Sequence, residues 1–301
     1  MKNKLRGKNA RGHDLKESSP RVLSSAASRL NQQPTPVITL LTDFGVADYF
    51  VGAMKGVILS VNPKACIVDI THDIPPQDIE AAAFNLLAAH DSFPAGTIHV
   101  AVVDPGVGSS RRPLLIEARN QFFIGPDNGI FTYVYHSPAG RKSPGIFELT
   151  NRKYFRQPVS PTFHGRDVFA PVAAALSRGV KPASLGTRVA DFFRLASLQP
   201  EASPDGRLMA RIIHIDRFGN CVTNITQDDL TAKMIAAGVT LQLKGKSVNS
   251  FRNYFAEETG SREKVFAVWD SAGFLEIAAT SDSAANLLNV HRGDSVVVIK
   301  G

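Results

Sequence analysis

Cysteine is scarce in this sequence of 301 residues, which contains only Cys66 and Cys221. The two residues lie far apart, each in an apolar stretch typical of a strand. They therefore predict neither a disulfide framework nor a cysteine metal site. We expect both to be buried free thiols of a cytoplasmic protein.

Long apolar runs are missing as well. No stretch approaches the roughly 18 residues of a membrane-spanning helix, and the first residues lack the apolar core of a secretory signal. These absences predict a cytoplasmic protein without membrane association.

The excess of positive charge belongs to one segment. The formal net charge is +7, but residues 1–36 hold eight Lys and Arg against two Asp and Glu, and the remainder holds 26 against 25. The basic segment has the composition of a disordered tail. Because no basic stripe with interleaved aromatic residues occurs, we expect no nucleic-acid partner.

Several familiar catalytic motifs are absent. There is no Gly-x-Ser-x-Gly nucleophile elbow and no His-Glu-x-x-His, which argues against a serine hydrolase or a zinc protease. Asp43-Phe44-Gly45 matches a kinase element by letters only, and Gly106-Val107-Gly108 lacks the lysine of a phosphate-binding loop.

A metal site is a weaker alternative. His72, Asp73, Asp43 and Asp104 are residue types that ligate divalent ions. Their spacing matches no compact ligand motif, so we expect no metal.

The first part of the folded region alternates apolar strands with helices. We expect strands at 37–42, 66–70, 97–103, 114–118, 122–124, 131–135 and 146–149, and helices at 49–61, 78–89 and about 163–176. Asp78 is the expected N-cap of the second helix. Strands of this kind between helices predict a parallel sheet covered on both faces. We place this α/β domain at residues 37–195.

Beyond residues 185–205, where periodicity is lost, the pattern changes to short strands. They are expected at 208–215, 221–225, 239–243, 264–269, 274–279 and 295–299, with one short helix near 283–288. Such spacing is typical of a small barrel or sandwich. The predicted fold class is therefore α/β, with a mostly parallel N-terminal sheet flanked by helices and a smaller, β-barrel-like C-terminal domain at 205–301.

The stretch Val102–Arg112 is the most informative part of the chain. A buried strand ends in Asp104, and a loop with two glycines leads to Arg111 and Arg112. Asp43 and Asp73 also follow apolar strands, and carboxyl ends of parallel strands share one edge of a sheet, where ligands bind. At each position, simple turn capping by aspartate is the structural alternative.

His164 is the histidine best placed for chemistry. It lies between Phe163 and Gly165, directly before a predicted helix, with Arg166 and Asp167 beside it. An ordinary histidine pKa near ~6.5 suits a group that accepts a proton at neutral pH.

Six motifs occur in a fixed order along the chain. They are Thr42-Asp43-Phe44-Gly45, Asp69-Ile70-Thr71-His72, Val103-Asp104-Pro105-Gly106-Val107-Gly108, Pro126-Asp127-Asn128-Gly129, Thr162-Phe163-His164-Gly165-Arg166-Asp167 and Asp216-Arg217-Phe218-Gly219-Asn220. Together they resemble the S-adenosyl-L-methionine (SAM) hydroxide adenosyltransferases, relatives of the fluorinases and chlorinases. The resemblance covers about residues 37–301.

The resemblance implies a homotrimer whose active sites lie between the N-terminal domain of one subunit and the C-terminal domain of the next. It also implies an activity, in which water displaces methionine from C5′ of SAM to give adenosine and L-methionine. SAM is then the small-molecule substrate, and no cofactor is implied.

The same resemblance implies roles for nine residues. The catalytic set matches Asp104, Arg111 and His164. Asp43 matches the residue that binds the ribose diol, and Asp48 and Asp216 match positions near the methionine ammonium. The C-terminal half of the pocket matches Phe218, Asn220 and Ser271.

This chemistry needs no general acid, because a sulfonium leaves as a neutral thioether. The site must supply an oriented, partly deprotonated water in line with the C–S bond. His164 would take the proton, and Asp104 would orient the imidazole or the water. Arg111 would keep that carboxylate ionised or stabilise developing hydroxide.

Two other functions are alternatives to SAM hydrolysis: halogenation and non-catalytic binding. The halogenases have a tyrosine where Asp104 stands, and a carboxylate there would repel a halide; they also carry an insertion after the glycine-rich loop, where this chain is short. A non-catalytic protein that binds SAM or adenosine for regulation is the other alternative. Binding alone would not require Asp104, Arg111 and His164 together.

Overall fold

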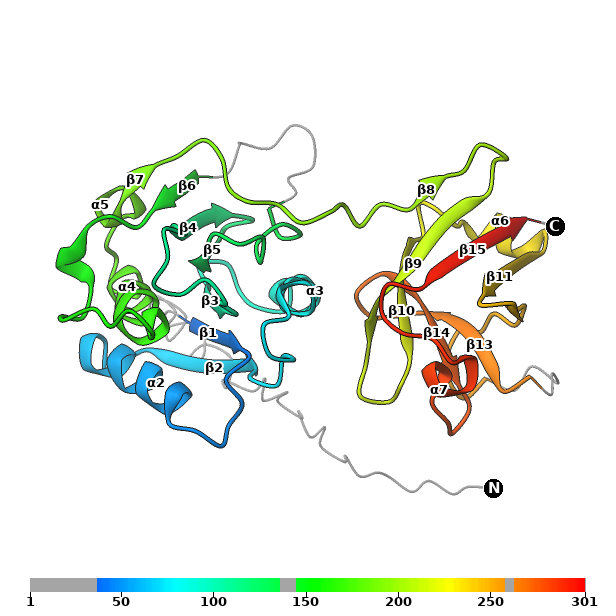
Figure 1. The fold of residues 1–301 in the computed structure, drawn as a ribbon, viewed down its shortest axis with the longest axis horizontal. Coiled ribbons are helices and arrows are strands. Elements are labelled where there is room, and N and C mark those ends of the chain that lie inside the picture. Colours follow the sequence, from blue (N-terminus) through cyan, green and yellow to red (C-terminus); the bar gives the residue numbers. More distant parts are fainter. Residues whose placement is uncertain (1–36, 136–144, 258–262, 301) are drawn as a thin grey trace, which may run out of the picture. The chain divides into compact units, whose positions relative to one another are not determined.

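The computed structural model describes residues 37–135, 145–257 and 263–300 (Figure 1). The tail predicted at residues 1–36 lies outside the described residues. The strands of the described residues form two sheets, one in each half of the sequence.

The first sheet has seven strands in the order β2-β1-β3-β5-β4-β6-β7. They are β1 (Val37–Thr42), β2 (Cys66–Thr71), β3 (Ile98–Val102), β4 (Pro113–Ala118), β5 (Gln121–Pro126), β6 (Gly145–Glu148) and β7 (Thr187–Arg188). The strands β2, β1, β3 and β5 are mutually parallel, and β4, β6 and β7 pair in antiparallel fashion. The predicted mostly parallel sheet is confirmed.

Helices cover both faces of this sheet (Figure 1). They are α2 (Phe50–Val61), α3 (Ile79–His90), α4 (Ala170–Ser177) and the short α5 (Pro182–Leu185), with a single 3-10 turn at Arg152–Tyr154. Helices α2 and α4 share a core with one face, and α3 packs on the other. The predicted cap of α3 is confirmed, because the Asp78 side chain accepts a hydrogen bond from Ala81 N at 2.9 Å.

Two expectations for this region are wrong. Residues 131–135 form a turn, in which Tyr135 N donates to Phe131 O at 3.1 Å, because the chain continues the bend at Pro126–Gly129 while still burying Phe131. Cys66 is exposed and only Cys221 is buried. The reason is strand order: β2 lies at the edge of the sheet, where fewer neighbours cover it.

The second sheet is antiparallel and has eight strands, seven of them in the order β12-β11-β15-β9-β10-β14-β13, with β8 paired to β9. The strands are β8 (Glu201–Ala202), β9 (Leu208–Ile215), β10 (Cys221–Thr226), β11 (Val239–Leu243), β12 (Lys246–Val248), β13 (Val265–Trp269), β14 (Phe274–Ala279) and β15 (Ser295–Lys300). A bridge between Phe251 and Ala267 brings the two ends of this order together. The sheet is therefore almost closed, which confirms the barrel-like prediction.

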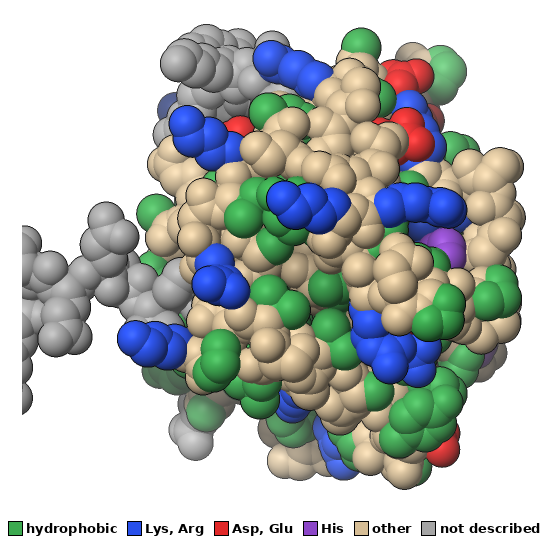
Figure 2. Space-filling model, turned by 90° about the vertical axis from the view of Figure 1, so that its left-hand side faces the viewer, with side chains coloured by type: hydrophobic (Ala, Val, Ile, Leu, Met, Phe, Trp, Pro, Cys, Tyr) green, Lys and Arg blue, Asp and Glu red, His purple; other side chains and the backbone are tan. Residues whose placement is uncertain are grey.

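Short helices accompany the second sheet. The predicted helix near 283–288 is confirmed as α7 (Ala284–Leu288), capped by Ser283. Helix α6 (Ala232–Ala236) and strand β12 have no counterpart in the sequence predictions. Figure 2 shows Lys and Arg side chains spaced singly over the face on the side of the first sheet, without a continuous stripe in that view.

Candidate active site

Asp104 and Arg111 form a bidentate ion pair. Asp104 follows β3, and the glycine-rich loop returns Arg111 to it. Arg111 Nε donates to Asp104 Oδ1 at 2.9 Å, and Arg111 Nη2 donates to Asp104 Oδ2. Both side chains are nearly buried, at 9% and 6% exposed. A fork of this kind fixes the guanidinium plane as well as its charge.

Arg111 also contacts His164. Its Nη2 lies 2.9 Å from His164 Nδ1, and because an arginine can only donate, Nδ1 is the accepting, unprotonated nitrogen. His164 lies at the start of a π-helical turn, Gly165–Phe169, which leads into α4. The Phe169 ring lies 5.3 Å from Arg111 Cζ and backs the guanidinium. The three residues therefore form one chain of hydrogen bonds with Arg111 in the middle.

The surroundings favour the neutral form of His164. Burial lowers the pKa of His164, the positive charge of Arg111 lowers it further, and the carboxylates of Asp104 and Asp167 act in the opposite direction. Arg111 Nη1 is buried and has no hydrogen-bond partner among the described residues. The unit thus places a guanidinium nitrogen with unpaired N–H groups in the same network as an imidazole nitrogen that accepts, and both kinds of group can bind a water molecule.

Glycine is required in the loop that joins these residues. Gly108 has a φ of +79°, and a Cβ there would lie 2.3 Å from Pro161 O. The loop after Asp104 therefore runs directly against the segment that precedes His164. This close approach is what brings Arg111 to the histidine.

Arg112 has a different task from its neighbour. Its Nε donates to Asp127 Oδ2 at 2.8 Å, and Asn128 Nδ2 donates to Val103 O at 2.7 Å. The turn after β5 is thereby tied to the end of β3. Of the two adjacent arginines, only Arg111 faces the acid and the histidine.

The loop after β1 carries two further predicted residues. Asp43 Oδ2 accepts a hydrogen bond from Gln77 N at 2.8 Å, and Asp48 is exposed. The Phe163 ring contacts this loop, with its centroid 6.0 Å from that of Phe44. The loop and the segment of His164 are therefore packed together through aromatic rings.

Asp73 does not join this group. It is exposed, and it forms no hydrogen bond or ion pair with Asp43 or Asp104 in the part of the chain that the structure describes. Its backbone N donates to Thr71 Oγ1 at 3.1 Å, so the threonine side chain, and not the aspartate, caps this turn.

The remaining predicted residues line one cavity on the second sheet. Asp216, Phe218, Asn220 and Ser271 border a space of about 740 Å³. Asp216 Oδ1 accepts hydrogen bonds from Phe218 N at 2.8 Å and Asn220 N at 2.9 Å, which holds the loop after β9. Asn220 Nδ2 donates to Asp216 Oδ2 at 3.0 Å. The Phe218 side chain is 78% exposed.

Sequence reasoning missed acidic residues in this cavity. Glu276 and Asp270 also line it. Burial, followed by the negative charges of Asp216 and Asp270, raises the pKa of Glu276 to about 7, and burial raises that of Asp270. A glutamate in the apolar strand Phe274–Ala279 was the available signal. Clustered carboxylates favour a cationic ligand.

The structure therefore separates the predicted residues into two groups. The first group, on the first sheet, comprises Asp43, Asp48, Asp104, Arg111 and His164. The second group comprises Asp216, Phe218, Asn220 and Ser271. No hydrogen bond or ion pair joins the two groups within the described residues.

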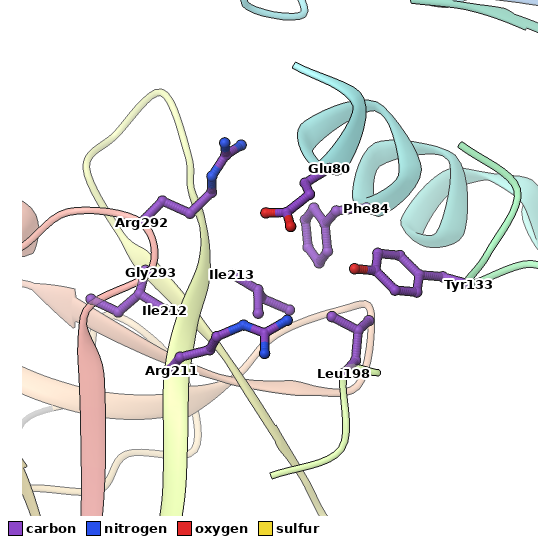
Figure 3. Close-up of a pocket in the computed structure, with 9 residues that line it drawn as sticks. All are labelled: Glu80, Phe84, Tyr133, Leu198, Arg211, Ile212, Ile213, Arg292 and Gly293. Carbon is purple, nitrogen blue, oxygen red and sulfur yellow. The ribbon is translucent and has the colours of Figure 1, made fainter. Parts of the chain in front are cut away.

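A different cavity, of about 180 Å³, lies between α3 and β9 (Figure 3). It is lined by Glu80, Phe84, Tyr133, Leu198, Arg211, Ile212, Ile213, Arg292 and Gly293. None of the predicted site residues belongs to it. Phe84 stacks on His214, with ring centroids 4.8 Å apart, so the cavity adjoins a packed contact between α3 and β9.

Within the described residues, no group of three or more His, Cys, Asp or Glu side chains is arranged to hold a metal ion. In the same residues, no helix has the length and apolar character needed to span a bilayer.

These features define a class of protein: a mostly parallel α/β sheet followed by an almost closed antiparallel sheet, with an acid–arginine–histidine unit at the end of β3. The chain belongs to the SAM hydroxide adenosyltransferase family. Models of the N-terminal and C-terminal domains of that family match residues 38–186 and 210–297.

Individual proteins are similar over most of their length. A protein of Methanocaldococcus jannaschii named (R)-S-adenosyl-L-methionine hydrolase is 38% identical, covering 87% of this chain and 95% of its own. A fluorinase of Nocardia brasiliensis is 28% identical over 88% of this chain and 97% of its own. The crystal structure of an uncharacterized conserved protein from Thermotoga maritima has a TM-score of 0.77 and 35% identity, over 87% of this chain and 100% of that one.

Proposed function

We propose that the protein hydrolyses SAM to adenosine and L-methionine. The observation that carries this proposal is the hydrogen-bonded unit of Asp104, Arg111 and His164 at the end of β3. Family membership supports the same reaction, as do the similar proteins named (R)-S-adenosyl-L-methionine hydrolase, which are 32–38% identical.

The name of those relatives also suggests the substrate's stereochemistry. The prefix L fixes the α-carbon, so (R) describes the sulfonium sulfur. We propose that this chain acts on the same epimer, in which the three substituents of sulfur are held for attack at C5′ along the C–S axis.

In the proposed reaction a water oxygen forms the bond to C5′ as the C5′–S bond breaks. The electron pair of that bond stays on sulfur, which leaves as a neutral thioether. Arg111 Nη1 donates to the water, and His164 Nδ1 takes its proton and later passes it to solvent. Arg111 Nη2 must release Nδ1 for this step, while Nε keeps Arg111 on Asp104. Asp104 thus acts through Arg111 and not directly on the imidazole.

We assign residues of both groups to substrate binding. Asp43 would accept the ribose hydroxyls, Asp48 and Asp216 would face the methionine ammonium, and Phe218, Asn220 and Ser271 would complete the pocket. The acidic lining of the second cavity supports binding of a substrate that carries both an ammonium and a sulfonium. The reaction needs no cofactor.

We further propose that the protein is a homotrimer in which the first group of one subunit meets the second group of the next. The separation of the groups and the exposed Phe218 support this arrangement. The catalytic domain would span 37–195 and the C-terminal domain 205–301, behind a basic tail at 1–36. A cytoplasmic location fits the free thiols Cys66 and Cys221.

The test is incubation of purified protein with each sulfonium epimer of SAM, followed by chromatography of the products. We expect equal amounts of adenosine and L-methionine from the (R) epimer, and none above background from Asp104→Ala. Parallel reactions with fluoride or chloride should yield no 5′-halogenated nucleoside. Binding of SAM without adenosine formation would instead identify the non-catalytic binding protein.

A further inference from the structure

We infer that His72 is a positioning residue that sets the conformation of the turn bearing Asp43. The inference rests on the proposed function, because it takes Asp43 as the residue that binds the ribose diol. His72 follows β2, and its side chain is almost fully buried beside the end of β1. It is distinct from the histidine of the catalytic unit.

The contact with β1 is made through the side chain. His72 Nδ1 lies 2.8 Å from Thr42 Oγ1, and that hydroxyl oxygen accepts a hydrogen bond from Phe44 N at 3.2 Å. Thr42 and Phe44 are the neighbours of Asp43 in the chain. The imidazole, the hydroxyl and the backbone N–H therefore form a short chain of contacts around the carboxylate-bearing residue.

The other ring nitrogen fixes the tautomer. His72 Nε2 lies 3.1 Å from Asp69 Oδ1, close but without the alignment of a hydrogen bond, and Lys55 Nζ donates to Asp69 Oδ2 at 2.6 Å. A carboxylate facing Nε2 favours the ring proton on that nitrogen. Nδ1 is then the acceptor for the Thr42 hydroxyl.

The backbone of the same segment completes the clamp. Gly45 N donates to His72 O at 2.8 Å, and Gln77 N donates to Asp43 Oδ2 at 2.8 Å. No hydrogen bond to Asp43 Oδ1 is found within the described residues. The turn is thus held on both sides while one carboxylate oxygen stays available for a ligand hydroxyl, as preorganised binding requires.

The same strand supplies a matched control. Thr39, also in β1, has its Oγ1 2.8 Å from His99 Nδ1, and both residues are fully buried. This second threonine–histidine pair equals the first in chemistry and distance. It makes no hydrogen bond to the turn at Asp43 within the described residues. Loss of the Thr39–His99 pair should lower the stability of the fold without changing the affinity for a nucleoside.

The experiment measures calorimetric binding of adenosine and of 2′,3′-dideoxyadenosine, which lacks the diol, to the full-length protein. We expect Thr42→Val to lower the affinity for adenosine about tenfold, because one hydrogen bond to a charged group is misplaced. The affinity of the same variant for dideoxyadenosine should fall less than about twofold. Thr42→Ser keeps the hydroxyl and should bind adenosine like the parent. His72→Asn should bind adenosine more tightly than His72→Gln, because the asparagine Oδ1 can accept a hydrogen bond from the Thr42 hydroxyl. Thr39→Val and His99→Asn should bind both nucleosides like the parent.

The inference would be overturned if Thr42→Val weakened binding of both nucleosides equally. It would also be overturned if Thr39→Val lost affinity for adenosine selectively. Equal affinity of the parent for both nucleosides would overturn it too, since Asp43 would then not read the diol. Thermal melting of every variant separates loss of fold from loss of recognition. Failure of the proposed function has a separate signature, which is absence of adenosine when the parent is given SAM.

Discussion

Arg111 donates a hydrogen bond to each carboxylate oxygen of Asp104, from Nε to Oδ1 at 2.9 Å and from Nη2 to Oδ2. The ion pair is nearly buried, so its two charges largely cancel where solvent cannot screen them. The same guanidinium reaches His164. The position of the proposed base is therefore set by a residue that is itself locked by the carboxylate.

We expect Arg111→Lys to lower kcat for SAM hydrolysis by about 100-fold, with KM within a few-fold of the parent. Lysine keeps the charge but cannot form the fork with Asp104 and bond His164 at the same time, and loss of one preorganised donor costs about that factor. Steady-state adenosine formation measures it. Arg112→Lys is the matched control and should stay within about threefold. Equal losses in the two variants would contradict a special role for Arg111.

The acid limb of the pH profile of kcat/KM should lie below the ordinary histidine pKa of 6.5. Burial and then Arg111 lower the pKa of His164, so the imidazole stays neutral to lower pH, and activity falls only when it becomes protonated. Replacing Arg111 by Gln removes a positive charge and should move the limb of the residual activity to higher pH. Replacing Asp104 by Asn removes a negative charge and should move it to lower pH. Shifts in the reverse directions would exclude His164 as the titrating group.

Gly108→Ala should lower the free energy of unfolding by about 3 kcal/mol and also lower kcat. The left-handed backbone strains any other residue, and the new Cβ would collide with Pro161 O. Gly96 shares the left-handed conformation, at φ +83°, but has open space around its Cβ position. Gly96→Ala should therefore cost about 1 kcal/mol and leave kcat unchanged. Chemical denaturation and turnover give both quantities, and equal effects would mean that the contact with Pro161 is unimportant.

Much of the fold could be predicted because its signals are local. Apolar strands that end in Asp43 and Asp104, and a helix begun by Asp78, are visible within a few residues. Cys66 shows the limit of that reasoning. Its strand is apolar, but its exposure follows from the place of β2 at the sheet edge, which pairing between distant segments decides.

The same limit applies to the candidate site. The family resemblance linked Asp104, Arg111 and His164, but the position of Arg111 between the other two is a property of the folded loop. Glu276 passed unnoticed because its raised pKa depends on burial and on Asp216 and Asp270, which lie outside its own strand. A single strand sequence carries no information on such neighbours.

The last prediction concerns the two separated groups. If each active site combines the first group of one subunit with the second group of the next, two inactive variants should complement each other. His164→Ala disables the first group, and Asp216→Asn disables the second while keeping its size. In a cyclic trimer containing both variants, about one of three interfaces joins an intact first group to an intact second group.

Co-expressed with different tags and purified through both, the mixed protein should show about one third of the parent's adenosine formation. Each variant alone, and the double variant, should be inactive. A site built within a single chain would leave the mixture inactive as well, because every chain would then carry one disabled group.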